Sequence, residues 1–195
     1  MTTTRLTFEP VTPERWRDFE ALFGARGACA GCWCMFFRGT RAVYKNNQGA
    51  GNKRRMKKII MGGETPGIIA YRVTEPVGWC AIAPRETYAA LERSKIMAPV
   101  DDKSVWSVTC LFIRKEFRRR GVSVRLLDAA AKYAASRGAR IVEGYPVEAR
   151  SPAEPDPFMY QGPASAFRRA RFEEVARRSP SRPVMRRAVR PPRGR

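Results

Sequence analysis

The apolar residues of the N-terminal third recur about every three to four positions, a spacing that predicts amphipathic helices. The first predicted helix opens at Thr12, carries Pro13 in its first turn and ends at Gly24. Its apolar face is formed by four large side chains, Trp16, Phe19, Leu22 and Phe23. A polar loop over 44–51 then leads to a basic helix over 53–61, for which Asn52 is the predicted N-cap.

Short apolar runs in the middle and at the end of the chain predict strands. The runs cover residues 67–73, 77–83, 106–113, 141–147, 172–177 and 183–189. The first two are separated by a short connection, which favours an antiparallel hairpin. The spacing of Val122, Leu126 and Ala130 predicts a long helix over 122–137, and shorter helices are predicted over 88–95 and 164–170. A Pro-rich loop is predicted over 152–163. Mixed strands and helices of this kind indicate an α/β (α+β) fold.

The length of 195 residues suits one domain of ordinary size, which we place at 1–190 with a basic C-terminal tail at 191–195. No apolar run approaches the roughly 18 residues of a membrane span, and no signal-peptide pattern opens the chain. We therefore expect a cytoplasmic protein without a membrane partner, as a monomer or a homodimer.

The formal net charge is +20, from 38 basic and 18 acidic residues. A charge of this size attracts polyanions at long range, and nucleic acid is one such partner. No basic motif interleaved with aromatic residues occurs, however, and an arginine-rich composition alone can produce the charge. Nucleic acid thus stays an alternative partner that the sequence does not favour.

Five cysteines and no histidine limit the metal and nucleophile chemistry of the chain. Cys29, Cys32 and Cys34 form a Cys-x-x-Cys-x-Cys motif, but a zinc site would need a fourth ligand from Cys80, Cys110 or a carboxylate. The surrounding segment is apolar and aromatic, which is typical of buried cysteines that pack as small hydrophobic residues. We predict no metal. The lack of histidine also excludes a Cys–His or Ser–His nucleophilic pair.

The turn after the 106–113 run carries the strongest chemical signal. Arg118, Arg119, Arg120 and Gly121 join this predicted strand to the long helix. The first N–H groups of a helix lack intrahelical partners and lie at the positive end of its dipole, so they favour a negative ligand. Guanidinium groups match phosphate oxygens, and glycine allows a ligand close to the backbone. The sequence therefore predicts a polyphosphate site beside a strand.

The residues Arg118-Arg-Arg-Gly-Val-Ser123 resemble the Arg/Gln-x-x-Gly-x-Gly/Ala signature of the GNAT superfamily, the acetyl-CoA-dependent N-acetyltransferases. Ser123 replaces the Gly or Ala of that signature. The segment 166–175 also resembles a later family segment, with Arg171 in place of its glycine, and the order of elements is similar over 5–190. The resemblance implies the GNAT fold: a mixed, mostly antiparallel sheet of about six to seven strands, splayed between strands four and five, with helices on both faces.

The resemblance also implies how acetyl-CoA is held as co-substrate. In the family the pantetheine arm lies in the splay, here between the strands predicted at 106–113 and 141–147. Backbone groups of the first strand would pair with the pantetheine amides, and the basic turn would hold the pyrophosphate. The implied cofactor-binding residues are Leu111, Phe112, Ile113, Arg118, Arg119, Arg120, Gly121, Val122 and Ser123.

The general base is not obvious from the sequence. Histone-type GNAT enzymes have a glutamate at the position that Ser107 takes here, and a serine could only position a water for proton relay. Glu143, on the adjacent predicted strand, is the first candidate base, and Glu86 is the second. For each glutamate, a salt bridge to one of the many arginines is the competing role.

The general acid is equally open. The family's tyrosine acid corresponds to Phe167, so either the thiolate leaves unassisted or Tyr160 supplies the proton from the neighbouring loop. Tyr160 could instead be a packing residue. A strand N–H, at Leu111 or Cys110, is predicted to hold the oxyanion.

We thus predict an N-acetyltransferase that moves an acetyl group from acetyl-CoA to a primary amine, of a small molecule, by direct attack. An unperturbed alkyl amine has a pKa of about 10.4, so a base or a desolvated site must provide the neutral form. One alternative is acetylation of protein lysines or an N-terminus. Another, of a different class, is an acyl-CoA-binding or nucleic-acid-binding regulatory protein on the same scaffold.

Overall fold

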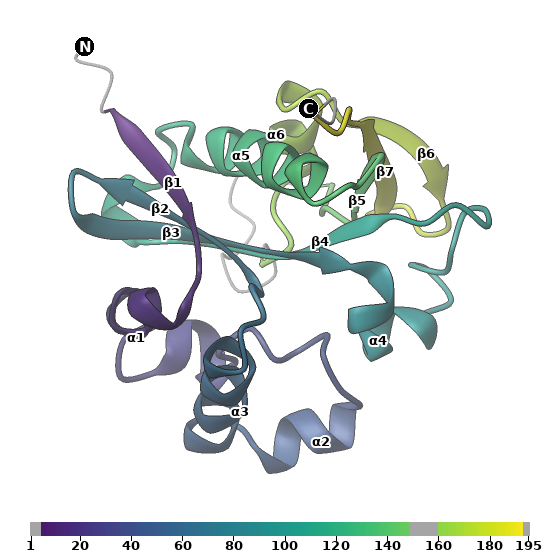
Figure 1. The fold of residues 1–195 in the computed structure, drawn as a ribbon. Coiled ribbons are helices and arrows are strands. Elements are labelled where there is room, and N and C mark those ends of the chain that lie inside the picture. The colour runs from purple at the N-terminus through teal and green to yellow at the C-terminus, as the bar shows by residue number, and fades with distance from the viewer. Residues whose placement is uncertain (1–4, 149–159, 193–195) are drawn as a thin grey trace.

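A computed structural model describes residues 5–148 and 160–192, and in it the chain forms one seven-stranded sheet with helices on both faces (Figure 1). The strands are β1 (Leu6–Pro10), β2 (Gly67–Arg72), β3 (Glu75–Pro84), β4 (Trp106–Ile113), β5 (Ile141–Gly144), β6 (Glu173–Arg177) and β7 (Pro183–Ala188). Their spatial order is β1-β2-β3-β4-β5-β7-β6, and β4–β5 is the parallel pair among antiparallel neighbours. The mixed, mostly antiparallel sheet that the family resemblance implied is confirmed.

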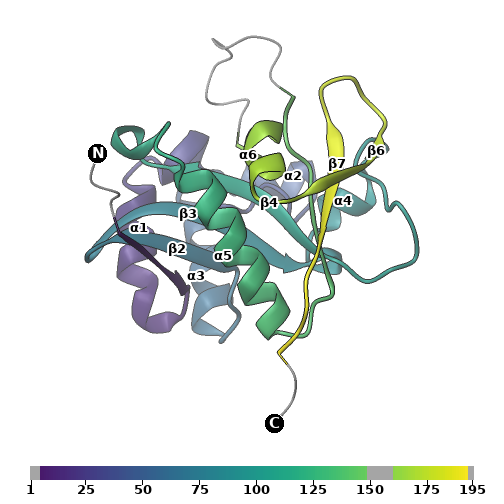
Figure 2. The same ribbon diagram turned by 90° about the horizontal axis from the view of Figure 1, so that it is seen from above.

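In the described part of the chain, six α-helices cover the sheet. One face carries α1 (Trp16–Phe23), α2 (Arg41–Asn46), α3 (Ala50–Met61) and α4 (Ala89–Glu92), and the other carries α5 (Val122–Ser136) and α6 (Ala164–Arg169) (Figures 1 and 2). Each face has its own apolar core, one between the sheet and α5 and one between the sheet and α1 and α3. No helix in the described part of the chain is long and apolar enough to cross a bilayer.

The helices with the clearest periodicity form where the sequence predicts them. All four predicted core residues of α1 are buried, and the helix ends at Gly24. Pro13 opens a short 3-10 turn over Pro13–Arg15, so the α-helix itself starts at Trp16. Helix α5 buries Val122, Leu126 and Ala130 against β3 and β2, and Gly138 follows its end with a φ of 91°.

Two local predictions in the N-terminal half are wrong, and one strand was not predicted. Asn52 does not cap α3, because it lies inside the helix, where its buried amide donates to the carbonyl oxygens of Gly31 (3.3 Å) and Tyr44 (3.5 Å). The predicted loop at 44–51 is partly helical, since α2 continues to Asn46. Strand β1 was missed because its apolar alternation covers only 5 residues and ends at a proline.

Strands β4 and β5 are paired only over Trp106–Val108, opposite Val142, Glu143 and Gly144, and separate beyond that point. The strand predicted to reach Val147 therefore ends at Gly144, where Tyr145-Pro146 leads the chain away from the sheet. This splay lies beside the N-terminal end of α5. Most of the Pro-rich segment predicted over 152–163 lies outside the described residues, as do residues 193–195 of the predicted tail.

Candidate functional site

The basic turn between β4 and α5 has the geometry of an anion site. Gly121 is the N-cap of α5 with a φ of 74°, and no side chain caps the helix. The first backbone bond of the helix runs from the Arg125 N–H to the Gly121 oxygen, so the amides before Arg125 lie outside the helical ladder. A Cβ placed on Gly121 would meet no atom within 4 Å, which means that the space before the helix is open. These features fit the pyrophosphate of CoA.

The three arginines of the turn differ in their surroundings. Arg118 is half-buried, and its Nε donates to the Ile113 oxygen at 3.0 Å, which fastens the turn to the end of β4. Arg119 and Arg120 are exposed. Arg119 has a φ of 59°, a left-handed conformation that costs a residue with a side chain about 1–3 kcal/mol. The strained turn therefore presents two guanidinium groups to solvent in front of the helix.

A small hollow of about 310 Å³ lies at this turn. Arg120 lines it together with Arg72 and Arg114, which come from β2 and from the end of β4, and both of these bind Glu75. Glu75 and Glu116 also line the hollow, so the surface beside the turn combines three arginines with two acids.

The free edge of β4 is formed by alternate residues. In an antiparallel ladder the backbone groups of successive residues point to opposite neighbours. The Leu111 N–H points away from β3 and donates to the Tyr160 oxygen at 2.7 Å, so Ile113 shares its direction, whereas Phe112 and Cys110 face β3. Of the three residues expected to pair with pantetheine, two direct their backbone groups into the splay. Leu111 is likewise the better placed of the two predicted oxyanion donors.

A described segment of the chain itself lies in the splay. The Tyr160 carbonyl accepts from Leu111, the Val147 N–H donates to the Gly162 oxygen at 2.9 Å, and the Ala164 N–H donates to the Val147 oxygen at 2.8 Å. Gly162 has a φ of 83°, and a Cβ there would lie only 2.6 Å from Leu111 Cδ1. Glycine therefore lets residues 160–162 approach β4 where the pantetheine arm is expected.

Ser107 and Glu143 are register partners across β4 and β5, and both are buried. Tyr145 joins them, since its Oη lies 3.0 Å from Ser107 Oγ and donates to Glu143 Oε1 at 2.6 Å. The carboxylate also accepts from Arg85 Nη1 at 3.1 Å and from Arg186 Nε at 2.7 Å. Burial, and then the Glu143 charge, raise the pKa of Tyr145 well above its usual value, so the phenol stays protonated. Two of the three predicted catalytic residues thus belong to one hydrogen-bonded network.

Three members of this network were not predicted. Tyr145 follows Glu143 by two positions, a spacing that can put two side chains on one side of an extended segment, so a signal for it was present. Arg85 and Arg186 come from distant parts of an arginine-rich chain, and no local pattern distinguishes them. Glu86, the second candidate base, is exposed on the 3-10 turn that begins with the buried Arg85.

Phe167, at the family's tyrosine position, is a packing residue. It is fully buried in α6, its ring packs edge-on against Phe172 with centroids 5.0 Å apart, and it fills the space beside Gly144. Tyr160 has its ring 5.5 Å from Phe36, and burial raises the pKa of its phenol. Of Phe167 and Tyr160, only Tyr160 therefore has a proton to donate. Its role as the general acid stays a prediction.

The Cys-x-x-Cys-x-Cys segment packs against β4 at Cys110, the residue before Leu111. Cys34 is buried with its Sγ 3.2 Å from Cys110 Sγ, Cys32 is half-buried, and Cys29 is exposed. Across residues 5–148 and 160–192, no three His, Cys, Asp or Glu side chains are arranged to hold a metal ion. The segment thus brings thiols, rather than a formed metal centre, to the strand that carries Leu111.

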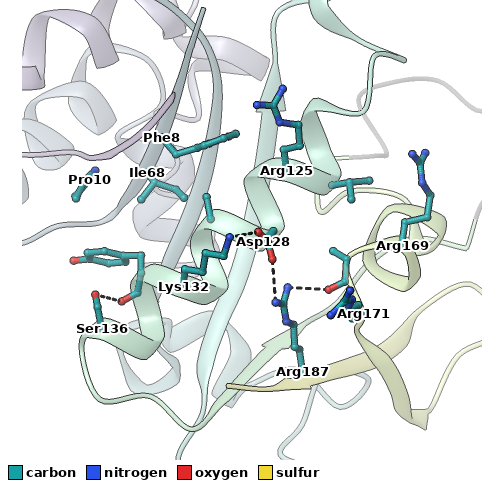
Figure 3. Close-up of a pocket in the computed structure, with 14 residues that line it drawn as sticks. Phe8, Pro10, Ile68, Arg125, Asp128, Lys132, Ser136, Arg169, Arg171 and Arg187 are labelled. Carbon is teal, nitrogen blue, oxygen red and sulfur yellow. Dashed lines mark hydrogen bonds and ion pairs between the residues drawn. The ribbon is translucent and has the colours of Figure 1, made fainter. Parts of the chain in front are cut away.

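A larger groove of about 1020 Å³ runs along α5 between β1 and α6, as Figure 3 shows. Asp128 lies at its centre, where it pairs with Lys132 (2.8 Å) and Arg187 (3.0 Å). Its other cationic residues are Arg125, Arg169 and Arg171. None of the residues predicted to bind the cofactor or to catalyse lines this groove. The volume of this groove therefore does not identify it as the site of acetyl transfer.

Comparison with known proteins agrees with this geometry. A family model described as the acetyltransferase (GNAT) family matches residues 42–153. No curated protein matches the chain. Among solved structures, a GNAT acetyltransferase from Listeria monocytogenes superposes with a TM-score of 0.57 at 8% identity, over 94% of this chain and 95% of that one.

Two further structures have the same fold. The PaiA N-acetyltransferase of Thermoplasma acidophilum, in complex with coenzyme A, gives a TM-score of 0.53 at 11% identity, over 95% of this chain and 99% of that one. The polyamine N-acetyltransferase of Drosophila melanogaster gives 0.54 at 12% identity, over 95% and 100%. At these identities the likeness concerns the fold, while the family model covers more than half of the chain. The protein therefore belongs to the GNAT family of acetyltransferases.

Proposed function

We propose that this protein transfers the acetyl group of acetyl-CoA to the primary amine of a small molecule, by direct attack of the amine on the thioester. The observation that carries the proposal is the uncapped N-terminus of α5, set beside the splayed edge of β4. Bound acetyl-CoA would supply the activated acetyl group. The residues of the chain would bind and orient acetyl-CoA, accept the proton of the amine and donate a proton to the leaving thiolate.

The turn and the strand would hold the cofactor through backbone groups. The N–H groups from Arg119 to Ser123 are the proposed pyrophosphate ligands, with guanidinium groups of the turn beside them. Val122 has its side chain in the core, so it can contribute only its backbone. The carbonyl group of Leu111 and the backbone of Ile113 would pair with the pantetheine amides. The Leu111 N–H would exchange the Tyr160 oxygen for the thioester carbonyl oxygen, and it would then stabilise the developing oxyanion.

We propose that Ser107, Tyr145 and Glu143 act together on the amine proton. Protonating Glu143 would leave Arg85 and Arg186 with only the more exposed carboxylates of Glu92 and Asp101 as counter-charges, which costs up to several kcal/mol. Glu143 would therefore act through the chain: it orients Tyr145, and Tyr145 orients Ser107 for a water that receives the proton. Glu143 is thus the first candidate for the negative charge that supports proton transfer through Tyr145 and Ser107.

Aromatic side chains support a role for desolvation. Phe36, Phe37, Tyr44 and Tyr160, here called the aromatic wall, pack on one another beside the thiols of β4 and the 29–34 segment. Burial raises the pKa of Tyr44 to about 12, so the wall disfavours a phenolate at this position. An amine entering such a place loses stabilisation of its ammonium form and becomes nucleophilic. Tyr160, protonated in the same wall, is the proposed donor to the leaving thiolate.

The preference for a small amine is tested by substrate screening. The Drosophila polyamine N-acetyltransferase catalyses the formation of N-acetylagmatine, so this fold can accommodate a small amine. Acetyl-CoA binding would be measured by calorimetry, and acetylated products from an amine library and from peptides would be identified by mass spectrometry. We expect binding, with turnover of free amines. The absence of binding at millimolar acetyl-CoA would overturn the enzyme assignment, and acetylation confined to peptides would overturn the substrate class.

A further inference from the structure

Three thiols from two distant parts of the chain form a row beside the candidate acyl site. Cys34 Sγ lies 3.2 Å from Cys110 Sγ, although the two residues are 76 positions apart. On the same segment, two positions before Cys34, the Cys32 sulfur lies 3.5 Å from the Gly27 oxygen. Cys110 immediately precedes Leu111 on β4. The Cys34 sulfur is thus in contact with that of Cys110, and the half-buried Cys32 lies two residues before it.

The backbone that places Cys34 in this row is strained. Four non-glycine residues between 28 and 34 have a positive φ, namely Ala28, Ala30, Trp33 and Cys34. Each such residue costs about 1–3 kcal/mol and persists only where the surrounding structure enforces it. Trp33 is held beneath Gly27 and under the ammonium of Lys53, whose Nζ lies 5.1 Å from the ring centroid. The fold therefore maintains an unfavourable conformation whose result is the approach of Cys34 to β4.

The three thiols differ in reactivity. Hydrogen bonds from Cys34 lower the pKa of Cys32 to about 6, so Cys32 is a thiolate at neutral pH, and its side chain is half-buried. Burial raises the pKa of Cys34 well above its usual value. The thiolate is the form that attacks peroxides and disulfides, and a thiol of low pKa is also the better leaving group. Cys32 is thus suited to start an oxidation and to be released from it.

We propose that Cys32, Cys34 and Cys110 form a peroxide-oxidised modification site whose product is a Cys34–Cys110 disulfide. The Cys32 thiolate attacks hydrogen peroxide, the O–O bond breaks, and hydroxide leaves and becomes water, giving a sulfenic acid on Cys32. The Cys34 sulfur displaces a second water and forms a Cys32–Cys34 disulfide. The Cys110 sulfur then attacks Cys34, and the Cys32 thiolate leaves. Overall two thiols lose two electrons and two protons, and the peroxide becomes two waters.

The disulfide would join the segment that carries Phe36 and Phe37 of the aromatic wall to β4, one residue before the proposed oxyanion donor Leu111. Access of the amine to the thioester would then be restricted until a reductant opens the bond. This consequence for catalysis rests on the proposed function, whereas formation of the cross-link does not.

The test maps thiols and acetyl transfer separately. Protein treated with hydrogen peroxide is alkylated, digested and analysed by mass spectrometry, and dimedone is used to trap sulfenic acid. Acetylated product is read by mass spectrometry, because a thiol-based assay would respond to the reductant. The variants are Cys32→Ser, Cys34→Ala and Cys110→Ala. Cys80→Ala is the matched control, since Cys80 is a buried cysteine whose side chain packs in the α5 core on the other face of the sheet.

In the unaltered protein and in Cys80→Ala we expect a peptide pair joined through Cys34 and Cys110, with acetyl transfer lost on oxidation and restored by dithiothreitol. Cys32→Ser should slow cross-linking by at least about tenfold, because a protonated thiol must then start the reaction. Cys110→Ala should accumulate sulfenic acid or a Cys32–Cys34 disulfide. Oxidation that stops at Cys32 in the unaltered protein, or a cross-link that persists in Cys34→Ala, would overturn the proposal, whether or not the protein acetylates amines.

Discussion

The backbone N–H of Leu111 donates to the carbonyl oxygen of Tyr160 at 2.7 Å, across the gap that opens where β4 and β5 separate. This bond uses the donor that the acyl group would need. A ligand in the splay must therefore compete with the chain's own carbonyl group, and the exchange of one acceptor for another is open to direct observation.

Binding of acetyl-CoA should change the surroundings of the Leu111 amide more than those of the Phe112 amide. The two residues are adjacent, but Phe112 faces β3 and serves as the internal control. The measurement is the amide chemical-shift change of each residue in a nitrogen-labelled protein on titration with acetyl-CoA. Equal changes at both amides, or none at Leu111, would contradict the proposed pairing of pantetheine with β4.

Gly121→Val should abolish acetyl-CoA binding, whereas Gly138→Val should not. Both glycines have a positive φ, of 74° and 91°, and neither would place a Cβ within 4 Å of another atom. Each substitution therefore carries a similar backbone strain, about 1–3 kcal/mol, at opposite ends of α5. Only Gly121 stands at the proposed phosphate site. Calorimetry of both variants, with thermal unfolding as a check on folding, separates loss of the site from loss of stability.

Glu143→Gln should lower the free energy of unfolding by up to about 3–5 kcal/mol, because it removes the buried counter-charge of Arg85 and Arg186 and leaves them only the more exposed carboxylates of Glu92 and Asp101. The control is Glu148→Gln, at a carboxylate that binds Arg168 and Arg177 at the surface and should cost at most about 1 kcal/mol. Denaturant unfolding gives both values. The rate of acetyl transfer per folded molecule should also fall in Glu143→Gln, and an unchanged pH–rate profile would remove Glu143 from the proton path.

Cys32 should react with iodoacetamide at neutral pH before Cys29 does, although Cys29 is the more exposed of the two. The pKa of Cys32 is lowered to about 6, so its thiolate forms as the pH rises through 6 and the rate then levels off. Burial raises the pKa of Cys29, whose rate should still be rising at pH 9. Peptide mapping after short exposures between pH 5 and 9 gives both curves. Faster alkylation of Cys29 at pH 7 would show that the hydrogen bonds from Cys34 do not stabilise the Cys32 thiolate.

The parts of the fold that could be predicted are those whose periodicity is long and local. The apolar run of β4 and the repeating core positions of α5 specify their elements almost to the residue. Asn52 was misplaced because a polar residue in front of a helix is a common cap, and only tertiary contacts explain its position inside α3. Its amide is paired by carbonyl groups that come from Gly31 and Tyr44.

The same distinction divides the candidate site. The proposed phosphate-binding turn could be predicted because its donors are consecutive backbone groups between a strand and a helix. The network around Glu143 is not, because its arginines lie 58 positions before and 43 positions after it. In a chain with 38 basic residues, nothing local marks which two will be buried.

The position of β7 has a consequence for the order in which the molecule can assemble. This strand lies between β5 and β6, although both precede it in the chain. During synthesis, β5 and β6 therefore emerge before the strand that separates them. Until β7 is in place, Glu143 lacks its ion pair with Arg186, and the backbone groups along one edge of β5 are unpaired. Until the final insertion, the nascent chain exposes a pairing edge and a carboxylate that lacks one of its two cations. Quality-control proteases and chaperones would find their target in that late intermediate rather than in the finished sheet.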